Sequence, residues 1–321
     1  MKFRQAFLAE PYKFIIKEVE ETPKGDEILV KLASSGLCNW ELNFWQGKLN
    51  FLGYPHSLGH EWAGVVAEVG PDATRFKMGD KVSGLARGFG GFAEYKVISE
   101  KACEKLADSV DPQYAMGEPQ KCVITVLRAV EPEVGDVGVI LGCGPMGLWC
   151  IQALAGKYLD KLIAVDIDDK KLAMAKTFGA THIINSKTEN VLEQITALTG
   201  GQLADFVIEG TGIPSIFNEA QQYVKSTGRG KLVLMSSHSS TTPEFDFRTA
   251  VDKSIQIIVA HPNYSHNEAD DFRRAVALIN NGTLQNEALV SHEWKLDDIE
   301  EAFKTLENKP ADFIKGIIVC N

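Results

Sequence analysis

The fold of this 321-residue chain is decided by one stretch, Val137-Gly138-Val139-Ile140-Leu141-Gly142-Cys143-Gly144-Pro145-Met146-Gly147. Its first half is apolar and favours a buried strand, and an apolar helix pattern follows its last glycine. Gly142, Gly144 and Gly147 form the pattern G-x-G-x-x-G. The first glycine allows a tight turn, the second lets the backbone approach a pyrophosphate, and the third allows close helix–strand packing, while the helix start faces the phosphate charge. The stretch therefore predicts the phosphate-binding turn of a dinucleotide-binding domain.

An acidic residue, Asp166, ends the next apolar run, about 20 residues after the last glycine, where such domains bind the ribose hydroxyls. Its carboxylate would repel a 2′-phosphate and no arginine stands beside it, which favours NAD over NADP. Lys170 and Lys171 keep NADP open as the alternative. The predicted cofactor-binding residues are Gly142, Gly144, Pro145, Met146, Gly147, Asp166 and Thr211.

Strand and helix patterns alternate around this stretch. Short apolar strands joined by helical crossovers form parallel sheets that are covered on both faces. Six such strands predict a doubly wound Rossmann domain over residues 119–266, within an α/β fold. The predicted strands are 137–141, 162–165, 182–184, 206–208, 232–235 and 255–259, and the predicted helices are 148–157, 170–178, 191–199 and 216–224.

The remaining residues, 1–118 and 267–321, predict a second domain. Short strand-like runs alternate there with glycine- and proline-bearing turns, as in a folded-over, barrel-like β domain. The tail carries two helix patterns and ends in a strand, which we expect to return to this domain. These predicted elements are the strands 28–32, 63–69, 93–97 and 316–319 and the helices 270–279 and 296–306.

Composition excludes several classes of protein. A hydrophobic share of 45% and a charged share of 24% are typical of a globular chain, and a net charge of −10 is unlike that of a nucleic-acid binder. Six cysteines without a C-x-x-C pair favour a reducing compartment, and residues 1–5 start no signal peptide, so we expect a cytoplasmic protein. Residues 137–156 are uncharged and long enough to span a membrane, but their glycines favour strand, turn and helix, which predicts no membrane segment.

Three separated segments contain side chains that commonly bind metals. Cys38 lies in Gly36-Leu37-Cys38-Asn39-Trp40-Glu41, His60 in Gly59-His60-Glu61, and Glu118 in Met116-Gly117-Glu118-Pro119. Thiolate, imidazole and carboxylate form an acceptable tetrahedral set for zinc, with a fourth position left for water or substrate. Each also has an ordinary interpretation: a buried cysteine, a hydrogen-bonded histidine, and an acid at the start of a helix. Spacing alone leaves both interpretations open.

Further segments follow in a fixed order along the chain: Ala63-Gly64-Val65-Val66, Val69-Gly70, Gly79-Asp80-Lys81-Val82 and Gly91-Phe92-Ala93-Glu94-Tyr95. With Gly59-His60-Glu61, the glycine-rich turn and Asp166, they make the sequence resemble, nearly end to end, the zinc-dependent medium-chain dehydrogenases/reductases, the alcohol and polyol dehydrogenase superfamily. Glu118-Pro119 is similar to the Glu-Pro segment of its sorbitol- and threonine-dehydrogenase-like members. In that branch a glutamate stands where classical alcohol dehydrogenases place a cysteine.

The resemblance implies one catalytic zinc, bound by Cys38, His60 and Glu118. Glu61 is then either a direct ligand or a carboxylate just behind the metal, and Glu41 matches an acid that usually orients the zinc histidine. The resemblance also implies hydride transfer between the carbinol carbon of a substrate and the nicotinamide of NAD.

Two departures from the family pattern matter. The segment between Val82 and Gly91 is too short for a lobe of four clustered cysteines, so we predict no structural zinc. Trp40 stands where relatives carry Ser or Thr, which passes the alcohol proton outward, and Asn43 stands where many carry histidine. The candidates for another proton route are a zinc-bound water with Glu118 or Glu61, or the ribose hydroxyls.

Aromatic and polar residues near the proposed ligands are candidates for the substrate pocket. Aromatic faces stack on sugar rings, and amide and imidazole groups bind hydroxyls, which favours a polyol, cyclitol or sugar. A simple aliphatic alcohol or an amino alcohol such as threonine stays open, and so does a core position for the aromatic residues. The candidates are Trp40, Asn43, Trp45, Tyr54 and His56.

The sequence also suggests how copies of the chain assemble. In the family, strands such as 254–260 pair across a two-fold axis, so we expect a homodimer, or a homotetramer built as a dimer of dimers.

Two other functions are rivals to the zinc-dependent dehydrogenase. They are a zinc-free quinone or enoyl reductase of the same superfamily and a nucleotide-binding protein without catalysis. The zinc-free reductases lack the set of cysteine, histidine and glutamate ligands, so metal analysis would separate them from this protein. Trp40 favours the second rival, and intact Cys38, His60, Glu61 and Glu118 argue against it.

Overall fold

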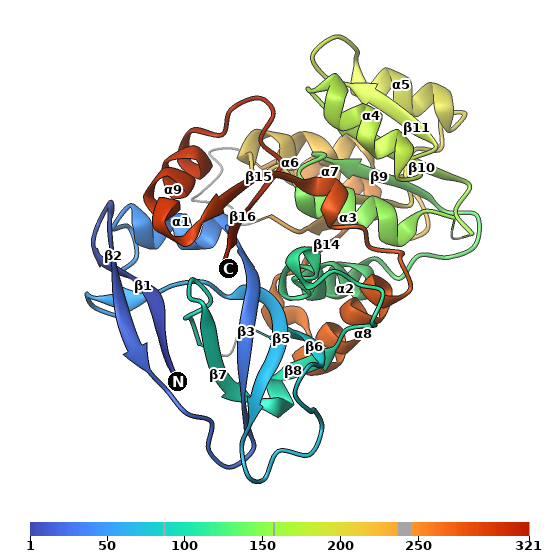
Figure 1. Ribbon diagram of the computed structural model, residues 1–321. Helices are drawn as coiled ribbons and strands as arrows, with labels where there is room; N and C mark the ends of the chain where they lie inside the picture. Colours follow the sequence, from blue (N-terminus) through green and yellow to red (C-terminus); the bar gives the residue numbers. More distant parts are fainter. Residues whose placement is uncertain (86–87, 157, 237–244, 321) are drawn as a thin grey trace. The chain divides into compact units, whose positions relative to one another are not determined.

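The computed structural model describes residues 1–85, 88–156, 158–236 and 245–320 (Figure 1). The chain forms two compact units, one of residues 1–121 and 272–321 and the other of residues 122–271. The domain boundaries that the sequence predicts after residues 118 and 266 stay predictions.

The second unit is built on a six-stranded parallel sheet with the strand order β11-β10-β9-β12-β13-β14. The chain starts at the centre with β9, runs outward through β10 and β11, and crosses back to β12, β13 and β14, which is a doubly wound order. Every residue of β9 is buried, as expected for a strand covered on both faces. All six predicted strands are present. They are β9 Val137–Leu141, β10 Lys161–Asp166, β11 His182–Asn185, β12 Phe206–Glu209, β13 Lys231–Leu234 and β14 Gln256–Val259.

Helices connect these strands, close to the predicted positions. At the start of α4 (Asp169–Thr177) the Asp168 side chain accepts hydrogen bonds from the Lys170 and Lys171 amides, which satisfies two of the helix's free donors. The predicted helix 216–224 ends early, at Ala220, and a 3₁₀ turn follows. The predicted end of another helix at Lys157 lies outside the described residues. The helices are α3 Pro145–Leu154, α4 Asp169–Thr177, α5 Val191–Leu198, α6 Pro214–Ala220 and α7 Phe247–Lys253.

The uncharged stretch 137–156 forms strand β9, the glycine turn and helix α3, as predicted. Gly142 has a φ of +93°, a conformation that a continuous helix could not contain. In the described part of the chain, no helix combines the length and the apolar character that crossing a bilayer requires.

The first unit contains a seven-stranded sheet and a three-stranded sheet, which form the predicted β domain. The larger sheet follows the path β15-β16-β3-β5-β6-β8, with β7 also paired to β3, and the smaller has the order β2-β1-β4. The predicted strand 93–97 begins only at Tyr95, and the hairpin of β1 and β2 was not predicted from the sequence. The strands are β1 Lys2–Glu10, β2 Lys13–Glu20, β3 Glu27–Gly36, β4 His56–Ser57, β5 Glu61–Val69, β6 Lys81–Gly84, β7 Tyr95–Ser99, β8 Cys103–Lys105, β15 Val290–Lys295 and β16 Lys315–Val319.

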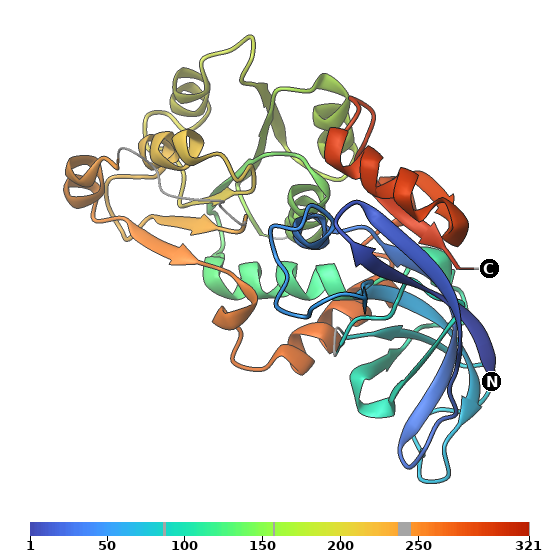
Figure 2. The ribbon, with the colours of Figure 1, turned by 90° about the vertical axis from the view of Figure 1, so that its left-hand side faces the viewer.

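The tail of the chain returns to this unit, as predicted. Strand β16 pairs antiparallel with β3, so that Ile317 lies opposite Gly36. Helix α9 contacts β15 and β16 and lies beside them in both views (Figures 1 and 2). The remaining helices are α1 Asn39–Trp45, α2 Glu118–Val130, α8 Glu268–Asn280 and α9 Ile299–Asn308.

The core of the first unit fixes the strands that carry the candidate metal ligands. Trp62 on β5 is fully buried, and a Cβ on Gly84 of β6 would lie 2.0 Å from its ring, so only glycine fits there. Strands β3 and β5 pair antiparallel, with Gly36 opposite Glu61. The end of β3 and the start of β5 therefore lie side by side, although they are distant in the sequence.

Candidate functional site

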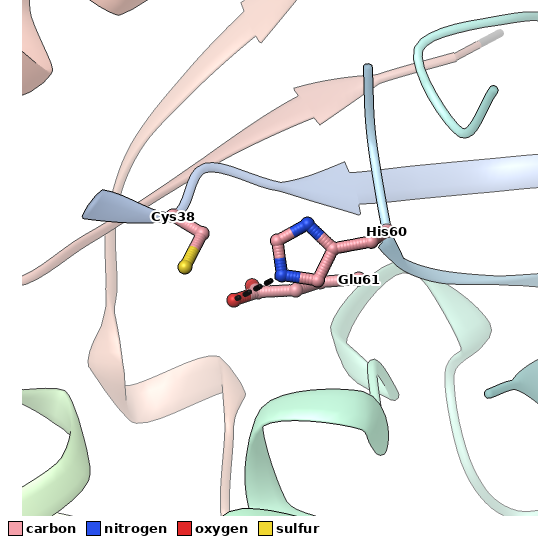
Figure 3. Close-up of side chains that lie close together, drawn as sticks. All are labelled: Cys38, His60 and Glu61. Atoms are coloured by element: carbon pink, nitrogen blue, oxygen red, sulfur yellow. Dashed lines mark ion pairs between the residues drawn. The ribbon is translucent and has the colours of Figure 1, made fainter. Parts of the chain in front are cut away.

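Three predicted metal-binding side chains come together at this strand end. Cys38 lies between β3 and α1, His60 directly precedes β5, and Glu61 is the first residue of β5. Their ligand atoms, one sulfur, one nitrogen and one oxygen, all lie within 4.8 Å of one another, and Figure 3 shows the side chains pointing toward one another. Zinc commonly takes this combination of donors in tetrahedral sites, so these residues fit the ion. We call Cys38, His60 and Glu61 the ligand cluster.

Two glycines make room for the ligand cluster. A Cβ on Gly36 would lie 2.2 Å from Glu61 Oε2, so a side chain there would displace the carboxylate. Gly59 has a φ of +93°, and a Cβ on it would lie 2.4 Å from the Phe92 amide nitrogen. Both glycines that precede the ligands in sequence are therefore required by local sterics.

Glu41 contacts the ring nitrogen of His60 that points away from the ligand cluster. Glu41 is fully buried, and its Oε1 lies 2.9 Å from His60 Nδ1 and accepts a hydrogen bond from the Gly59 amide at 2.6 Å. The other ring nitrogen, Nε2, lies 4.0 Å from Glu61 Oε1. Carboxylate partners of this kind fix the tautomer and the orientation of metal-binding histidines.

The charges around His60 change its affinity for protons. Burial lowers the pKa of the His60 imidazole, but the charges and hydrogen bonds of Glu41 and Cys38 raise it more, so the pKa lies well above its usual value. In metal-free protein the ring therefore keeps its second proton to a higher pH than an exposed histidine would. A metal ion must displace that proton in order to bind.

Glu118, the first residue of α2, lies next to His60 but outside the ligand cluster. Its Oε2 lies 3.8 Å from His60 Nε2. The Gly117 amide donates a hydrogen bond to Ser83 Oγ at 2.8 Å, which fixes the start of α2 against β6. Burial raises the pKa of the Glu118 carboxyl, and the nearby positive charges of His60 and Lys121 only partly oppose this.

Two buried lysines, which were not predicted from the sequence, hold the two carboxylates. Lys315 Nζ on β16 lies 2.5 Å from Glu61 Oε2 and donates to the Leu37 carbonyl at 2.8 Å. Lys121 Nζ lies 3.0 Å from Glu118 Oε1. Burial lowers the pKa of Lys315, but the Glu61 carboxylate and other acidic neighbours raise it more, so Lys315 stays charged. The helical spacing of Glu118 and Lys121 is a signal visible in the sequence, whereas no local pattern points to Lys315.

The glycine-rich turn of the second unit has the sterics that its sequence predicts. A Cβ on Gly147 would lie 2.0 Å from the Gly142 carbonyl oxygen, so this glycine permits the close contact of helix and turn. A Cβ on Gly144 would meet no described atom within 4 Å, so the space beside this glycine is open. Pro145 and Met146 open α3, which places the free amides of the helix start at the turn.

Asp166 and Thr211 lie beside this turn. Asp166 ends β10, and its Oδ2 accepts a hydrogen bond from the Cys143 amide at 2.7 Å. The Thr211 amide donates to Glu209 Oε1 at 2.7 Å, and a Cβ on Gly142 would lie 3.1 Å from Thr211 Cγ2. The predicted cofactor-binding residues thus meet at the carboxyl ends of β9, β10 and β12, where open α/β sheets bind nucleotides.

The chain is similar to known dehydrogenases along most of its length. It matches the family models described as alcohol dehydrogenase GroES-like domain, over residues 24–108, and zinc-binding dehydrogenase, over residues 145–281. (R,R)-Butanediol dehydrogenase of Bacillus subtilis (strain 168) is 28% identical and covers 91% of this chain and 92% of its own. L-Arabinitol 4-dehydrogenase of Aureobasidium melanogenum is 26% identical, with 96% and 90% covered. The crystal structure of a short chain alcohol dehydrogenase from Escherichia coli CFT073 complexed with NADH has a TM-score of 0.85 at 26% identity, with 99% of both chains covered.

The chain belongs to the medium-chain dehydrogenase/reductase superfamily. It is a zinc-type oxidoreductase of the alcohol dehydrogenase kind, with zinc and a nicotinamide dinucleotide as cofactors. The predicted family, fold class and enzyme type are thereby confirmed. The roles of individual site residues and the lack of a structural zinc stay predictions.

An aromatic pair lies beside the ligand cluster of this dehydrogenase. The Trp40 ring centroid is 5.8 Å from that of His60, and Trp40 is 42% exposed. Phe89, which was not predicted as a site residue, stacks parallel to Trp40 with the centroids 5.5 Å apart. Trp40 therefore presents apolar surface next to a proposed metal ligand, as a pocket residue would.

Three other candidates for the pocket are engaged in local contacts. The rings of Tyr54 and His56 stack with their centroids 5.3 Å apart. The Asn43 amide donates to the carbonyl of Trp40, on its own helix, at 3.3 Å. Their part in substrate binding stays a prediction.

Trp45 requires a correction. It is fully buried, and its ring lies 5.5 Å from that of Phe14 and 5.4 Å from that of Phe303, centroid to centroid. Tyr12 packs on it edge to face. Trp45 therefore belongs to the hydrophobic core and not to the substrate pocket, because helix α1 turns this residue away from the side that carries Trp40.

Proposed function

We propose that this dehydrogenase interconverts a hydroxyl and a carbonyl group on a polyol, cyclitol or sugar, with NAD as the hydride acceptor or donor. The observation that carries the proposal is the ligand cluster, whose donor atoms lie within 4.8 Å of one another. The glycine turn with Asp166 in the second unit supports the choice of cofactor.

Cys38, His60 and Glu61 are the residues proposed to hold the zinc. Zinc supplies a Lewis acid that stabilises negative charge developing on a substrate hydroxyl, and NAD supplies the redox chemistry. The chain contributes preorganisation: Glu41 fixes the His60 ring, and Lys315 holds Glu61 by one oxygen. The glycine at position 36 leaves space for that carboxylate.

The hydroxyl proton needs an acceptor other than a serine or threonine, since Trp40 occupies the usual position of that relay. Glu118 is the proposed acceptor, because it is buried and its Oε2 lies 3.8 Å from His60 Nε2, at the border of the ligand cluster. Glu61 and the ribose hydroxyls are the alternatives. Normal activity and pH dependence in both Glu118→Gln and Glu61→Gln would exclude the two carboxylates.

The choice of NAD over NADP rests on Asp166. Its carboxylate lies against the turn, where it accepts the Cys143 amide, and a negative charge there opposes a 2′-phosphate. The similar Escherichia coli structure contains NADH.

The choice of a polyol, cyclitol or sugar rests on the relatives named for butanediol and arabinitol and on the exposed ring of Trp40. The test is reduction of NAD by the purified protein over a panel of polyols, cyclitols, sugars, aliphatic alcohols and threonine. Each assay is repeated after zinc removal by a chelator and after zinc is restored. We expect activity on a polyol or ring substrate that disappears with the chelator and returns with zinc. Chelator-insensitive activity, or a zinc-loaded protein inactive on the whole panel, would contradict the proposal.

A homodimer is proposed on the second unit. Strand β14 is the last strand of the sheet, and Ile257 and Val259 on it are exposed. Phe247 and Val251 on the preceding helix are 73% and 71% exposed, which is unusual for large apolar residues. Sedimentation should give a dimer, or a tetramer built from it, and Val259→Lys should shift it toward monomer while the zinc content stays unchanged.

A further inference from the structure

Two buried carboxylates face the same nitrogen of His60, and a separate lysine holds each of them by its other oxygen. Glu61 Oε1 lies 4.0 Å from His60 Nε2, and its Oε2 pairs with Lys315. Glu118 Oε2 lies 3.8 Å from the same nitrogen, and its Oε1 pairs with Lys121. Lys121 is 4% exposed and Glu118 is 6% exposed, so this second ion pair is as much an interior feature as the first.

The two lysines hold their carboxylates to different parts of the chain. Lys315 also donates to the carbonyl of Leu37, the neighbour of Cys38, so it ties Glu61 to the backbone beside the thiol. Lys121 lies one helical turn after Glu118, so it ties Glu118 to its own helix. In agreement with this difference, Glu61 belongs to the ligand cluster and Glu118 does not.

Zinc chemistry gives this difference a consequence. Catalytic zinc sites use three protein ligands and keep a position open for the substrate. Cys38, His60 and Glu61 already supply three, so a ligand from Glu118 would close the site. A thiolate with two carboxylates would also set three negative charges against a divalent ion, which would weaken its action as a Lewis acid.

We propose that Lys121 is a positioning residue that keeps Glu118 out of the metal coordination sphere. The carboxylate oxygen that Lys121 does not hold is then left to accept a hydrogen bond from the substrate hydroxyl. This inference rests on the proposed function, since it assumes that the ligand cluster holds zinc. It differs from a stabilising role for the ion pair, because it predicts that loss of the lysine makes zinc binding tighter.

The direct test removes the charge of Lys121. Lys121→Met keeps the length of the side chain, and Lys121→Arg keeps its charge. Arg128→Met is the matched control, since Arg128 lies further along α2 and forms an ion pair with Asp271 of α8. The readouts are zinc affinity of the apoprotein by competition with a chelator, the visible spectrum after Co²⁺ substitution, and kcat. Lys121→Met should bind zinc about tenfold more tightly. It should also show the weaker Co²⁺ bands of a higher coordination number and have a lower kcat. Lys121→Arg and Arg128→Met should bind zinc like the wild type.

An unchanged or weakened zinc affinity in Lys121→Met, with a wild-type Co²⁺ spectrum, would overturn the inference. If Lys121→Met does not fold, Glu118→Gln decides. A zinc affinity within about twofold of the wild type supports the inference, and a loss of about tenfold or more identifies Glu118 as a ligand and overturns it. Glu61→Gln is the positive comparison and should lose affinity.

Failure of the proposed function has a different signature. A wild-type protein that binds no zinc contradicts the proposed function and this inference together. A wild-type protein that binds zinc but oxidises no substrate contradicts the proposed function alone, because the order of zinc affinities among the variants still decides the role of Lys121.

Discussion

The ligand cluster and the glycine turn depend on opposite properties of their side chains. Around the cluster, buried charged side chains position the ligands: Glu41 holds His60, and Lys315 holds Glu61. At the turn, function depends on side chains that are absent, since a Cβ on Gly147 would lie 2.0 Å from a backbone oxygen. The cluster should therefore respond to changes of charge at constant size, and the glycines of the turn to changes of size at constant charge.

The largest effect is expected for Cys38→Ser, which exchanges a thiolate for a poor zinc ligand of similar size. Zinc should be lost on dialysis, and kcat should fall by at least about a thousandfold, because the Lewis acid is worth several kcal/mol. Zinc per chain and steady-state kinetics measure both, and binding of NAD should remain. Cys122→Ser is the control and should keep its zinc; retention of zinc in Cys38→Ser would show that the ion binds elsewhere.

The matching change at the turn is Gly147→Ala. The added Cβ must push the Gly142 carbonyl away, which should lower the free energy of unfolding by roughly 1–3 kcal/mol and weaken NAD binding. Gly144→Ala is the comparison, because its Cβ has open space and its φ is −70°. It should keep the stability and lose only NAD affinity. Denaturant unfolding and NAD titration separate the two, and equal stability of both variants would contradict the steric account.

Asp166, which ends β10 beside the turn, is the residue of the second unit at which charge should matter. Asp166→Asn should weaken NAD binding by about tenfold, through the loss of charged hydrogen bonds to the ribose, and should strengthen NADP binding. Asp168→Asn, a change at the cap of α4, should leave the ratio of the two affinities unchanged. A ratio that stays unchanged in Asp166→Asn would remove this residue from cofactor selection.

A change of pH should alter zinc binding in the unmodified protein. Because the pKa of His60 is raised, the metal-free ring is protonated below that pKa and must lose this proton when zinc binds. Zinc affinity should therefore fall by about tenfold per pH unit for each proton displaced as the pH is lowered. Zinc titrations at several pH values measure the slope. A flat profile would show that His60 is not displaced from a protonated state.

The turn could be predicted almost completely from the sequence, because strand, glycines and helix are contiguous and each glycine has a local steric reason. The cluster could be predicted only through a family resemblance, since Cys38 and His60 meet through the pairing of β3 with β5. Lys315 could not be found at all, because it reaches Glu61 from the last strand of the chain. Trp45 was misplaced for a related reason: sequence proximity to Cys38 does not reveal which side of α1 faces the core.

The most direct test of the metal centre is X-ray absorption spectroscopy of the zinc-loaded protein, together with zinc content per chain. We expect one zinc per chain, with a single sulfur ligand from Cys38 and nitrogen and oxygen ligands otherwise. In Cys38→Ser the zinc–sulfur signal should disappear. A protein that takes up no zinc, or whose zinc keeps its sulfur signal in Cys38→Ser, would contradict a zinc site at Cys38, His60 and Glu61.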